Sequence, residues 1–303
     1  MLVIVAPGQG AQTPGFLGPW LELPGLADRL TAWSDLIGLD LVAYGTTADA
    51  DEIRDTAVAQ PLLVAAGLAV AEVLGASPDI VAGHSVGEFT AAALAGVLTP
   101  EQALVLVRER GRAMAKAASV TETGMSAVLG GVEEEVLAAI AAAGLTAANV
   151  NGAGQIVAGG TLEQLAAFKA GPPARARVIP LAVAGAFHTE HMASAVDRLR
   201  EAAADLDPAD PVVTLLSNRD GEAVPSGAEF LARLVAQVAS PVRWDACMAG
   251  MANRGVTTMI ELVPGGTLTG LAKRALRGVT AVALKTPDDL EAARAALGSN
   301  EER

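Results

Sequence analysis

The hydrophobic positions along the chain form short apolar runs that end in glycine or polar residues. Two such runs lie early, at 1–6 (MLVIVA) and 79–85 (DIVAGHS), and two come later, at 212–218 (VVTLLSN) and 257–265 (TTMIELVPG). Nearly continuous apolar runs of this length are typical of strands buried on both faces, as in a parallel sheet. We therefore predict a parallel sheet that contains these segments.

Longer patterns between the runs predict helices. Residues 60–75 indicate a buried helix with a proline in its first turn, and residues 87–98 continue as another. Residues 99–118 predict a third helix, capped by a threonine that is followed by proline. Strands that alternate with helices predict an α/β fold, in which helices cover the sheet.

The pattern changes near residue 124. The elements expected from there on are a strand (124–131), a helix (132–144), two short strands about a turn (145–160), a helix (161–171) and a strand (174–188). This β-α-β-β-α-β order predicts a ferredoxin-like subdomain. We place that subdomain at 124–187, inserted into a larger one formed by 1–123 and 188–303.

The composition supports a substantial core. The chain has 303 residues, of which 51% are hydrophobic and only 3% aromatic, and it contains 32 glycines. This length suits one large domain or two modest ones. The core must therefore be filled mainly by Ala, Val, Leu and Ile, with glycine allowing close backbone approach.

Charge and cysteine content narrow the class of protein. A net charge of −13, with no basic stretch interleaved with aromatic residues, argues against nucleic-acid binding. The single cysteine, Cys247, fits a reducing cytoplasm, and no Cys/His cluster has metal-ligand spacing. The N-terminus lacks the pattern of an export signal, and the longest uncharged run, 136–162, is interrupted by Asn, Gln and Gly. We expect a cytoplasmic monomer with no metal and no membrane contact.

Ser85 lies between two glycines in GHSVG (83–87), where a predicted strand meets an alanine-rich helix. In a nucleophile elbow the serine occupies a strained turn, and glycines flank it because side chains there would collide with the strand or the helix. The hydroxyl then projects at a helix N-terminus, where backbone N–H groups can stabilise an oxyanion. The alternative is an ordinary loop serine; the flanking strand and helix favour a nucleophile.

A nucleophilic serine needs a base, and the chain has three histidines, His84, His188 and His191. His84 adjoins the serine, so its side chain should point elsewhere and serve packing or hydrogen bonding. His191 should be exposed to solvent. His188 stands at the predicted end of a strand, where such sheets collect catalytic groups, and we favour it as the base.

Arg110 differs from the basic residues around it. Arg108, Arg112 and Lys116 recur every four residues on one helix face. Arg110 is about 200° from Arg108 around the helix and should face the body of the protein. A buried guanidinium is costly unless it meets an anion. It would serve either a structural salt bridge or a bidentate clamp for a substrate carboxylate.

Several motifs, spread over nearly the whole chain, resemble one enzyme family. They are PGQGAQ (7–12), GHSVGE (83–88), VRERG (107–111), NVNGAGQIV (149–157), GAFHT (185–189), QVASPVRW (237–244) and ELVPGGTLTGLAKR (261–274). In content and order they resemble malonyl-CoA:acyl carrier protein transacylases, to which acyltransferase domains of polyketide synthases are related. The resemblance implies an α/β-hydrolase-like large subdomain, with the active site in the cleft between it and the ferredoxin-like insert.

The resemblance also implies a role for particular residues. Ser85 would be the acylated nucleophile, His188 its base, and Arg110 the residue that holds the malonyl carboxylate. Gln9 and Val86 would form the oxyanion hole through their backbone N–H groups.

Gln237 matches the glutamine associated with orienting the histidine, in a family that uses backbone carbonyls there instead of an acid. The block AFH (186–188) resembles the malonyl-selecting form, in which Phe187 would crowd the α-methyl group of methylmalonyl. Gly185 replaces the first residue of the HAFH tetrapeptide of polyketide domains. We also expect Asn151, in NVNGAGQIV, to bind substrate.

The implied reaction is a ping-pong transfer of malonyl from malonyl-CoA to the phosphopantetheine thiol of holo acyl carrier protein. It would pass through malonyl-Ser85, need no cofactor, and serve fatty-acid or polyketide synthesis. Two alternatives stay open: a serine hydrolase, which passes the acyl group to water, and a non-enzymatic scaffold.

Carrier proteins are generally acidic, so an enzyme with a charge of −13 would need a local basic patch to dock one. The candidates are Arg108, Arg112 and Lys116, or the AKRALR segment (272–277). Either could instead be a solvated helix face.

Overall fold

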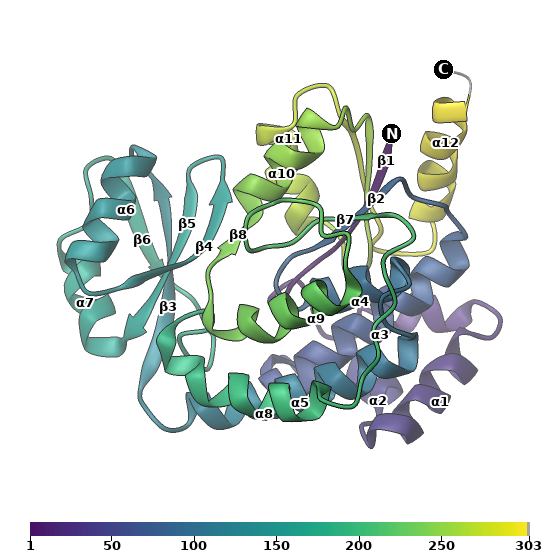
Figure 1. Cartoon of the computed structure of the whole chain (residues 1–303), viewed down its shortest axis with the longest axis horizontal. Helices are drawn as coiled ribbons and strands as arrows, with labels where there is room; N and C mark the ends of the chain where they lie inside the picture. Colours follow the sequence, from purple (N-terminus) through teal and green to yellow (C-terminus); the bar gives the residue numbers. More distant parts are fainter. Residues whose placement is uncertain (302–303) are drawn as a thin grey trace.

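Two sheets organise the fold (Figure 1). The structure is a computed structural model that describes residues 1–301, with side chains through Leu297. The parallel sheet has the spatial order β10 (Thr280–Ala283), β9 (Thr258–Glu261), β1 (Leu2–Ala6), β2 (Ile80–Gly83), β7 (Thr214–Leu215). The second sheet has the order β6 (Ala176–Pro180), β3 (Thr123–Gly130), β5 (Gln155–Thr161), β4 (Thr146–Gly152), β8 (Val242–Arg243). The predicted α/β class is confirmed.

Helices form most of the rest of the described chain. They are α1 (Leu26–Ile37), α2 (Leu41–Thr46), α3 (Thr56–Leu74), α4 (Gly87–Leu94), α5 (Pro100–Ala118), α6 (Glu133–Ala142), α7 (Leu162–Ala170), α8 (Ala193–Ala203), α9 (Gly227–Ala236), α10 (Trp244–Asn253), α11 (Thr267–Ala275) and α12 (Asp289–Glu301). Short 3₁₀ helices are η1 (Gly18–Glu22), η2 (Glu52–Arg54), η3 (Glu190–Met192) and η4 (Gln237–Ala239).

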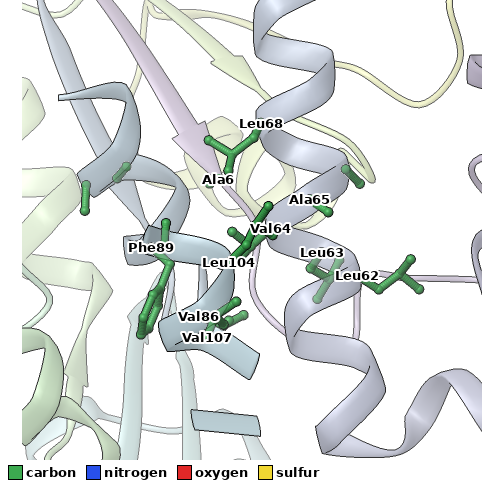
Figure 2. Close-up of a cluster of buried hydrophobic side chains, with 14 of the residues drawn as sticks. Ala6, Leu62, Leu63, Val64, Ala65, Leu68, Val86, Phe89, Leu104 and Val107 are labelled. Atoms are coloured by element: carbon green, nitrogen blue, oxygen red, sulfur yellow. The ribbon is translucent and has the colours of Figure 1, made fainter. Parts of the chain in front are cut away.

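The central strand β1 is buried on both faces, which explains its uninterrupted apolar sequence. Leu2, Ile4 and Ala6 pack into one core with α3, α4 and α5, whereas Val3 and Val5 pack into another with α10 and α11. Figure 2 shows part of the first core, where side chains from β1, α3, α4 and α5 meet. Because successive side chains of a strand point to opposite faces, helices must cover both sides of this sheet.

Helix α3 is longer than the sequence predicts. The Asp55 carboxylate accepts a hydrogen bond from the Ala57 N–H at 2.8 Å and caps the helix, which therefore begins at Thr56. Pro61 lies inside the helix, so its predicted place in the first turn is wrong. By length and composition α3 could cross a membrane, but 78% of its apolar 18-residue window is buried within the protein.

Helix α5 begins where the sequence predicts. The Thr99 hydroxyl accepts from the Gln102 N–H at 3.1 Å, and the Gln102 side chain accepts from the Thr99 N–H at 2.9 Å. This reciprocal capping box fixes the helix start and with it the rotation of every residue that follows. Helix α5 packs against α3 on one side and α8 on another, so its inward face is buried.

The second sheet follows the predicted β-α-β-β-α-β order, with β3, α6, β4, β5, α7 and β6 in sequence. Helices α6 and α7 lie together on one face (Figure 1). Strand β8, from much later in the chain, pairs in parallel with β4 and leads directly into α10, which packs against the large sheet. The subdomain boundaries at 124 and 187 stay a prediction.

Several predicted strands end earlier in the structure. Strand β6 stops at Pro180, where its ladder with β3 ends, and residues 181–188 are irregular. The Leu181 N–H still donates to the Met125 oxygen at 2.9 Å, but the Val183 N–H then turns back to the Leu181 oxygen at 3.0 Å, which ends the extended course of the strand. The prediction that His188 stands at a strand end is therefore wrong. Strands β7 and β9 likewise cover only part of 212–218 and 257–265.

Candidate active site

The turn between β2 and α4 holds Ser85 in a left-handed backbone conformation, with φ 53°. A Cβ atom on Gly83 would lie 1.9 Å from the Gly87 carbonyl carbon, and one on Gly87 would lie 2.2 Å from the Ala6 oxygen. Neither position tolerates a side chain, because backbone fills the space. The turn thus has the geometry of a nucleophile elbow.

Ser85 and His188 form a hydrogen-bonded pair. Ser85 Oγ lies 2.7 Å from His188 Nε2, and His188 Nδ1 lies 2.8 Å from the backbone oxygen of Gln237. An imidazole that donates from Nδ1 to a carbonyl presents Nε2 as an acceptor to the serine hydroxyl. The backbone carbonyl of Gln237 therefore takes the position that an acid occupies in a Ser-His-Asp triad.

His188 is buried, and its backbone is strained, with φ 60°. Burial, and then the positive charge of Arg110, lower the pKa of His188 to about 3. The imidazole is consequently neutral near pH 7. A neutral imidazole can accept the serine proton without first losing one of its own.

The backbone N–H groups of Gln9 and Val86 have no hydrogen-bond partner within residues 1–301. Val86 directly precedes α4, where helical N–H groups lack partners in the helix itself. The Gln9 side chain is anchored, because Nε2 donates to the Arg54 oxygen and to Thr56 Oγ1, both at 3.3 Å. Two N–H groups beside the elbow are thus available to an oxyanion.

Arg110 is fully buried on the inward face of α5, as the helix periodicity predicts. Its Nη2 donates to Gln237 Oε1 at 2.8 Å, and its guanidinium carbon lies 5.8 Å from the centre of the Phe89 ring. Its Nε and Nη1 atoms have no partner among the described residues. Burial lowers the pKa of Arg110 to about 10, so the group stays charged at neutral pH. A buried cation with free donors is suited to binding an anion.

A buried polar network lies behind the serine. Asn218 Oδ1 accepts from the Ser85 N–H at 2.7 Å, and Asn218 Nδ2 donates to the Gly83 oxygen at 2.7 Å. The Asn218 N–H donates to Glu88 Oε1 at 2.6 Å. Gln237 Nε2 donates to the Ser85 oxygen at 3.0 Å and also to Glu88 Oε2. The strained serine peptide is therefore held at both its N–H and its carbonyl.

Glu88 and Asn218 are site residues that were not predicted from the sequence. Glu88 is the last residue of the GHSVGE motif, and Asn218 ends the apolar run at 212–218. A polar residue directly after a buried parallel strand is a signal for a site, because ligands gather at the carboxyl ends of such strands. That signal was present at Asn218.

A cavity of about 660 Å³ opens beside the Ser–His pair. The predicted site residues that line it are Gln9, Ser85, Asn151, Phe187 and His188; those that do not are Val86, Arg110 and Gln237. Gln60 and Met114 also line it, and the buried Gln60 Oε1 has no partner among the described residues. The remaining walls come from the loop after β1 (8–14), from residues at and near η2, from the second sheet and the segment 181–183 that follows it, and from α11.

The other two histidines occupy different places. His84 Nε2 lies 2.9 Å from Asn151 Oδ1, and its ring packs edge-on against Trp244. The predicted packing and hydrogen-bonding role of His84 thus agrees with the structure, although His84 also lines the cavity. His191 is half-buried in η3, so its predicted exposure is wrong.

Gly185 has a packing reason to be glycine. A Cβ atom there would lie 2.7 Å from the Ala118 Cβ at the end of α5, so a larger residue does not fit. Phe187, two residues later, is buried and faces the cavity.

The two basic clusters differ in exposure. Arg108 is half-buried and donates to the Ala57 oxygen at 2.6 Å, and Arg112 pairs with Glu109 at 3.1 Å. The cluster on α5 is therefore partly occupied by contacts within the protein. Within the described part of the chain, Lys273, Arg274 and Arg277 are exposed and make no ion pair. They lie on or next to α11, which lines the cavity.

Among the side chains that the structure describes, through Leu297, no group of three or more His, Cys, Asp or Glu could hold a metal ion. Cys247 is buried and unpaired.

Fold and site together define an α/β protein with a Ser–His pair on a strand-to-helix turn, beside a cavity between two sheets. The acyl transferase domain family matches residues 3–296. The chain belongs to this family and is an acyltransferase.

Its relatives carry a more specific name. A malonyl CoA-acyl carrier protein transacylase of Mycobacterium tuberculosis is 54% identical over 297 residues, which cover 96% of this chain and 98% of the relative. The enzyme of that name from Bacillus subtilis is 35% identical, with 96% of each chain covered.

Solved structures agree. The crystal structure of MCAT from Mycobacterium tuberculosis superposes with a TM-score of 0.93 at 54% identity, covering 96% of this chain and 99% of that one. A malonyl-transacylase in complex with a type II PKS acyl-carrier protein has a TM-score of 0.90 at 30% identity, covering 96% of this chain and 98% of that one.

Proposed function

We propose that this acyltransferase moves the malonyl group of malonyl-CoA to the phosphopantetheine thiol of acyl carrier protein. The transfer is ping-pong, proceeds through malonyl-Ser85, and uses no cofactor. The observation that carries the proposal is the 2.7 Å Ser85–His188 contact, linked through Gln237 to a buried Arg110 with two free donors. The names of the relatives support the choice of substrates.

In the first half-reaction, His188 Nε2 accepts the Ser85 proton as Oγ attacks the thioester carbonyl. The Gln237 carbonyl stabilises the imidazolium through Nδ1, at 2.8 Å. The N–H groups of Gln9 and Val86 stabilise the tetrahedral oxyanion. Collapse breaks the carbon–sulfur bond, and His188 returns its proton to the departing coenzyme A thiolate.

The second half-reaction reverses these steps with a different thiol. His188 accepts the proton of the phosphopantetheine thiol, and the sulfur attacks the malonyl-Ser85 ester. Collapse breaks the bond to Ser85 Oγ, which takes the proton back from His188. The products are malonyl-acyl carrier protein and free enzyme.

Arg110 selects the acyl group. Its unpartnered Nε and Nη1 can donate to both oxygens of the distal malonyl carboxylate. Acetyl, which lacks the carboxylate, leaves these buried donors unpaired and is disfavoured. A hydrolase of simple esters would have no use for this buried cation, which favours transfer of a charged acyl group over hydrolysis.

The test is intact-mass analysis after incubation with malonyl-CoA. We expect a stable adduct of one malonyl group on Ser85, discharged rapidly by holo carrier protein. Apo carrier protein, which lacks the phosphopantetheine thiol, is the control and should not discharge it. An adduct lost to water at the same rate with or without holo carrier protein would identify a hydrolase.

Carrier proteins of fatty-acid and of polyketide synthesis, compared in this assay, would reveal which pathway the enzyme serves.

Lys273, Arg274 and Arg277 are the cluster we propose to dock the acidic carrier protein, because they are exposed, unpaired within the described residues and adjacent to the cavity. Reversing their charges should raise the KM for carrier protein by about 10-fold and leave malonyl-CoA loading unchanged. Reversal at Arg112 and Lys116 is the matched control. Docking would lie elsewhere if the control reversal raised the KM for carrier protein more. The same would follow if reversal at 273, 274 and 277 impaired malonyl-CoA loading as much as it raised that KM.

We further propose that the enzyme acts as a monomer in the cytoplasm.

A further inference from the structure

Gln237 is held between a donor and acceptors. Arg110 Nη2 donates to its Oε1 at 2.8 Å, while its Nε2 donates to the Ser85 oxygen at 3.0 Å and to Glu88. A guanidinium can only donate, and an ionised carboxylate can only accept. The amide therefore has one orientation. Its backbone carbonyl accepts from His188 Nδ1, so Gln237 connects the base, the elbow and Arg110.

Glu88 has no part in the mechanism above, yet it is 1% exposed in the first turn of α4. Both of its carboxylate oxygens face donors: Oε1 accepts from the Asn218 N–H at 2.6 Å and Oε2 from Gln237 Nε2. If Glu88 only stabilised the start of the helix, it would not need to contact Gln237, whose carbonyl accepts from His188 and whose amide oxygen accepts from Arg110. Its position at the far end of the Arg110–Gln237 chain requires another explanation.

We propose that Glu88 is a positioning residue for acyl selection: its buried carboxylate fixes the Gln237 amide and thereby directs the free donors of Arg110 toward the acyl carboxylate. The inference rests on the proposed function. If the carboxylate is removed, Gln237 Nε2 keeps the Ser85 oxygen at 3.0 Å and Asn218 Oδ1 at 3.5 Å as acceptors but loses its charged one, so the amide turns its NH₂ group toward Arg110 more readily. Two donors would then face each other, and the guanidinium would move.

The charge state of Glu88 makes this testable by pH. The charged or titratable groups that face it are Arg110 on α5, Arg233 on α9 and Cys247 on α10. Burial raises the pKa of Glu88 to about 7, against the opposing effect of its hydrogen bonds from Asn218 and Gln237. The ionised form is thus lost as pH falls through about 7.

His188 does not titrate in that range, because its pKa is about 3. A loss of malonyl selectivity centred near pH 7 would therefore report Glu88. A second cavity of about 380 Å³, lined by Glu88, Gln237 and Arg233 among others, lies behind the network and gives Glu88 a path for proton exchange apart from the substrate cavity.

The experiment measures initial rates of Ser85 loading with malonyl-CoA and with acetyl-CoA across pH. In the wild type, the malonyl:acetyl ratio of kcat/KM should fall as pH drops from about 8 to about 6. In Glu88→Gln the ratio at pH 8 should be lower by about 10- to 100-fold, mainly through the KM for malonyl-CoA, and independent of pH. Glu88→Asp, which keeps the charge, should restore part of the ratio. Glu134→Gln, at an exposed position on α6, is the control and should match the wild type.

A Glu88→Gln variant with the wild-type ratio would overturn the inference, as would a wild-type ratio that is constant over this pH range. The second measurement needs no variant, so it decides the matter even if Glu88→Gln fails to fold. In both of these cases the proposed function survives. Absence of any malonyl preference in the wild type would instead overturn the proposed function, and this inference with it.

Discussion

The two walls of the cavity are built differently. On the large-sheet side, the cavity-lining Ser85 and His188 are joined by hydrogen bonds of 2.7 to 3.0 Å to each other and to Gln237 and Asn218, which do not themselves line the cavity. The second sheet contributes Met125 and Val157 together with the polar Asn149, Asn151 and Gln155, and Asn151 contacts the opposite wall through His84 at 2.9 Å. The difference shows a division of labour: reacting atoms need fixed positions, whereas an acyl group needs a volume of the right shape.

The difference also has an energetic side. In the buried network each lost partner leaves a polar atom unsatisfied, at a cost of about 1–3 kcal/mol. Apolar wall residues can be exchanged with smaller loss, as long as their volume is kept. Substitutions on the large-sheet side should therefore affect rate and stability, and those on the second-sheet side should mainly affect which acyl group is accepted.

The largest effect is expected from Ser85→Ala. Without the nucleophile no malonyl-enzyme forms, and the rate of transfer should fall by about 10⁴-fold or more. Transfer kinetics and intact-mass analysis measure both consequences. Ser119→Ala, at the exposed end of α5, is the control and should keep wild-type rates. Full transfer activity in Ser85→Ala would refute the catalytic assignment.

Gly83→Ala should destabilise the elbow strongly, because its Cβ would lie 1.9 Å from the Gly87 backbone. We expect a loss of about 3 kcal/mol in the free energy of unfolding, measured by urea denaturation. The control comes from the other subdomain: Gly171→Ala has no atom within 4 Å of the new Cβ and should be nearly neutral. Equal effects at the two sites would contradict the account of the elbow.

Arg110→Ala should remove malonyl preference. We expect kcat/KM for malonyl-CoA to fall by about 100-fold while some loading of acetyl remains, because a charge-assisted pair is lost. The exposed Arg112→Ala is the matched control on the same helix. Unchanged selectivity in Arg110→Ala would show that the carboxylate binds elsewhere. The experiment is needed because Arg110 does not itself line the cavity.

Phe187→Ala should have the smallest and most selective effect. Removing the ring leaves room for an α-methyl group, so methylmalonyl loading relative to malonyl should rise by about 10-fold. Competition between the two CoA esters measures the ratio. Phe168→Ala, in the core of the second sheet away from the cavity, is the control. It should lower stability without altering the methylmalonyl:malonyl ratio. The idea fails if both variants change selectivity equally.

Local features were predictable where local sterics or helix periodicity decide them. The elbow at Ser85 follows from backbone space at two glycines, and the inward direction of Arg110 follows from the rotation of a helix with a defined cap. The order of elements in the second sheet was also predictable. Arg108 shows the limit, because its periodicity indicates an exposed face while packing of α5 on α3 half-buries it.

Other features depend on segments far apart in the chain. His188 was expected at a strand end, but β6 stops at Pro180 and an irregular segment brings the imidazole to the serine, 103 residues away in sequence. Glu88 and Asn218 meet across 130 residues, and Gln237 and Glu88 across 149. Such pairings have no local signature.

By itself, then, the sequence determined the α/β class, the strained serine turn, the buried arginine and, through its motifs, the family. Only the tertiary structure decided which atoms meet: the carbonyl that orients His188, the two free donors of Arg110, and the carboxylate of Glu88 behind the Gln237 amide. The physical reason is the distance along the chain over which each kind of interaction acts. Backbone sterics and side-chain periodicity act over a few residues, whereas hydrogen bonds within a buried site join whatever the packing of two sheets brings within about 3 Å.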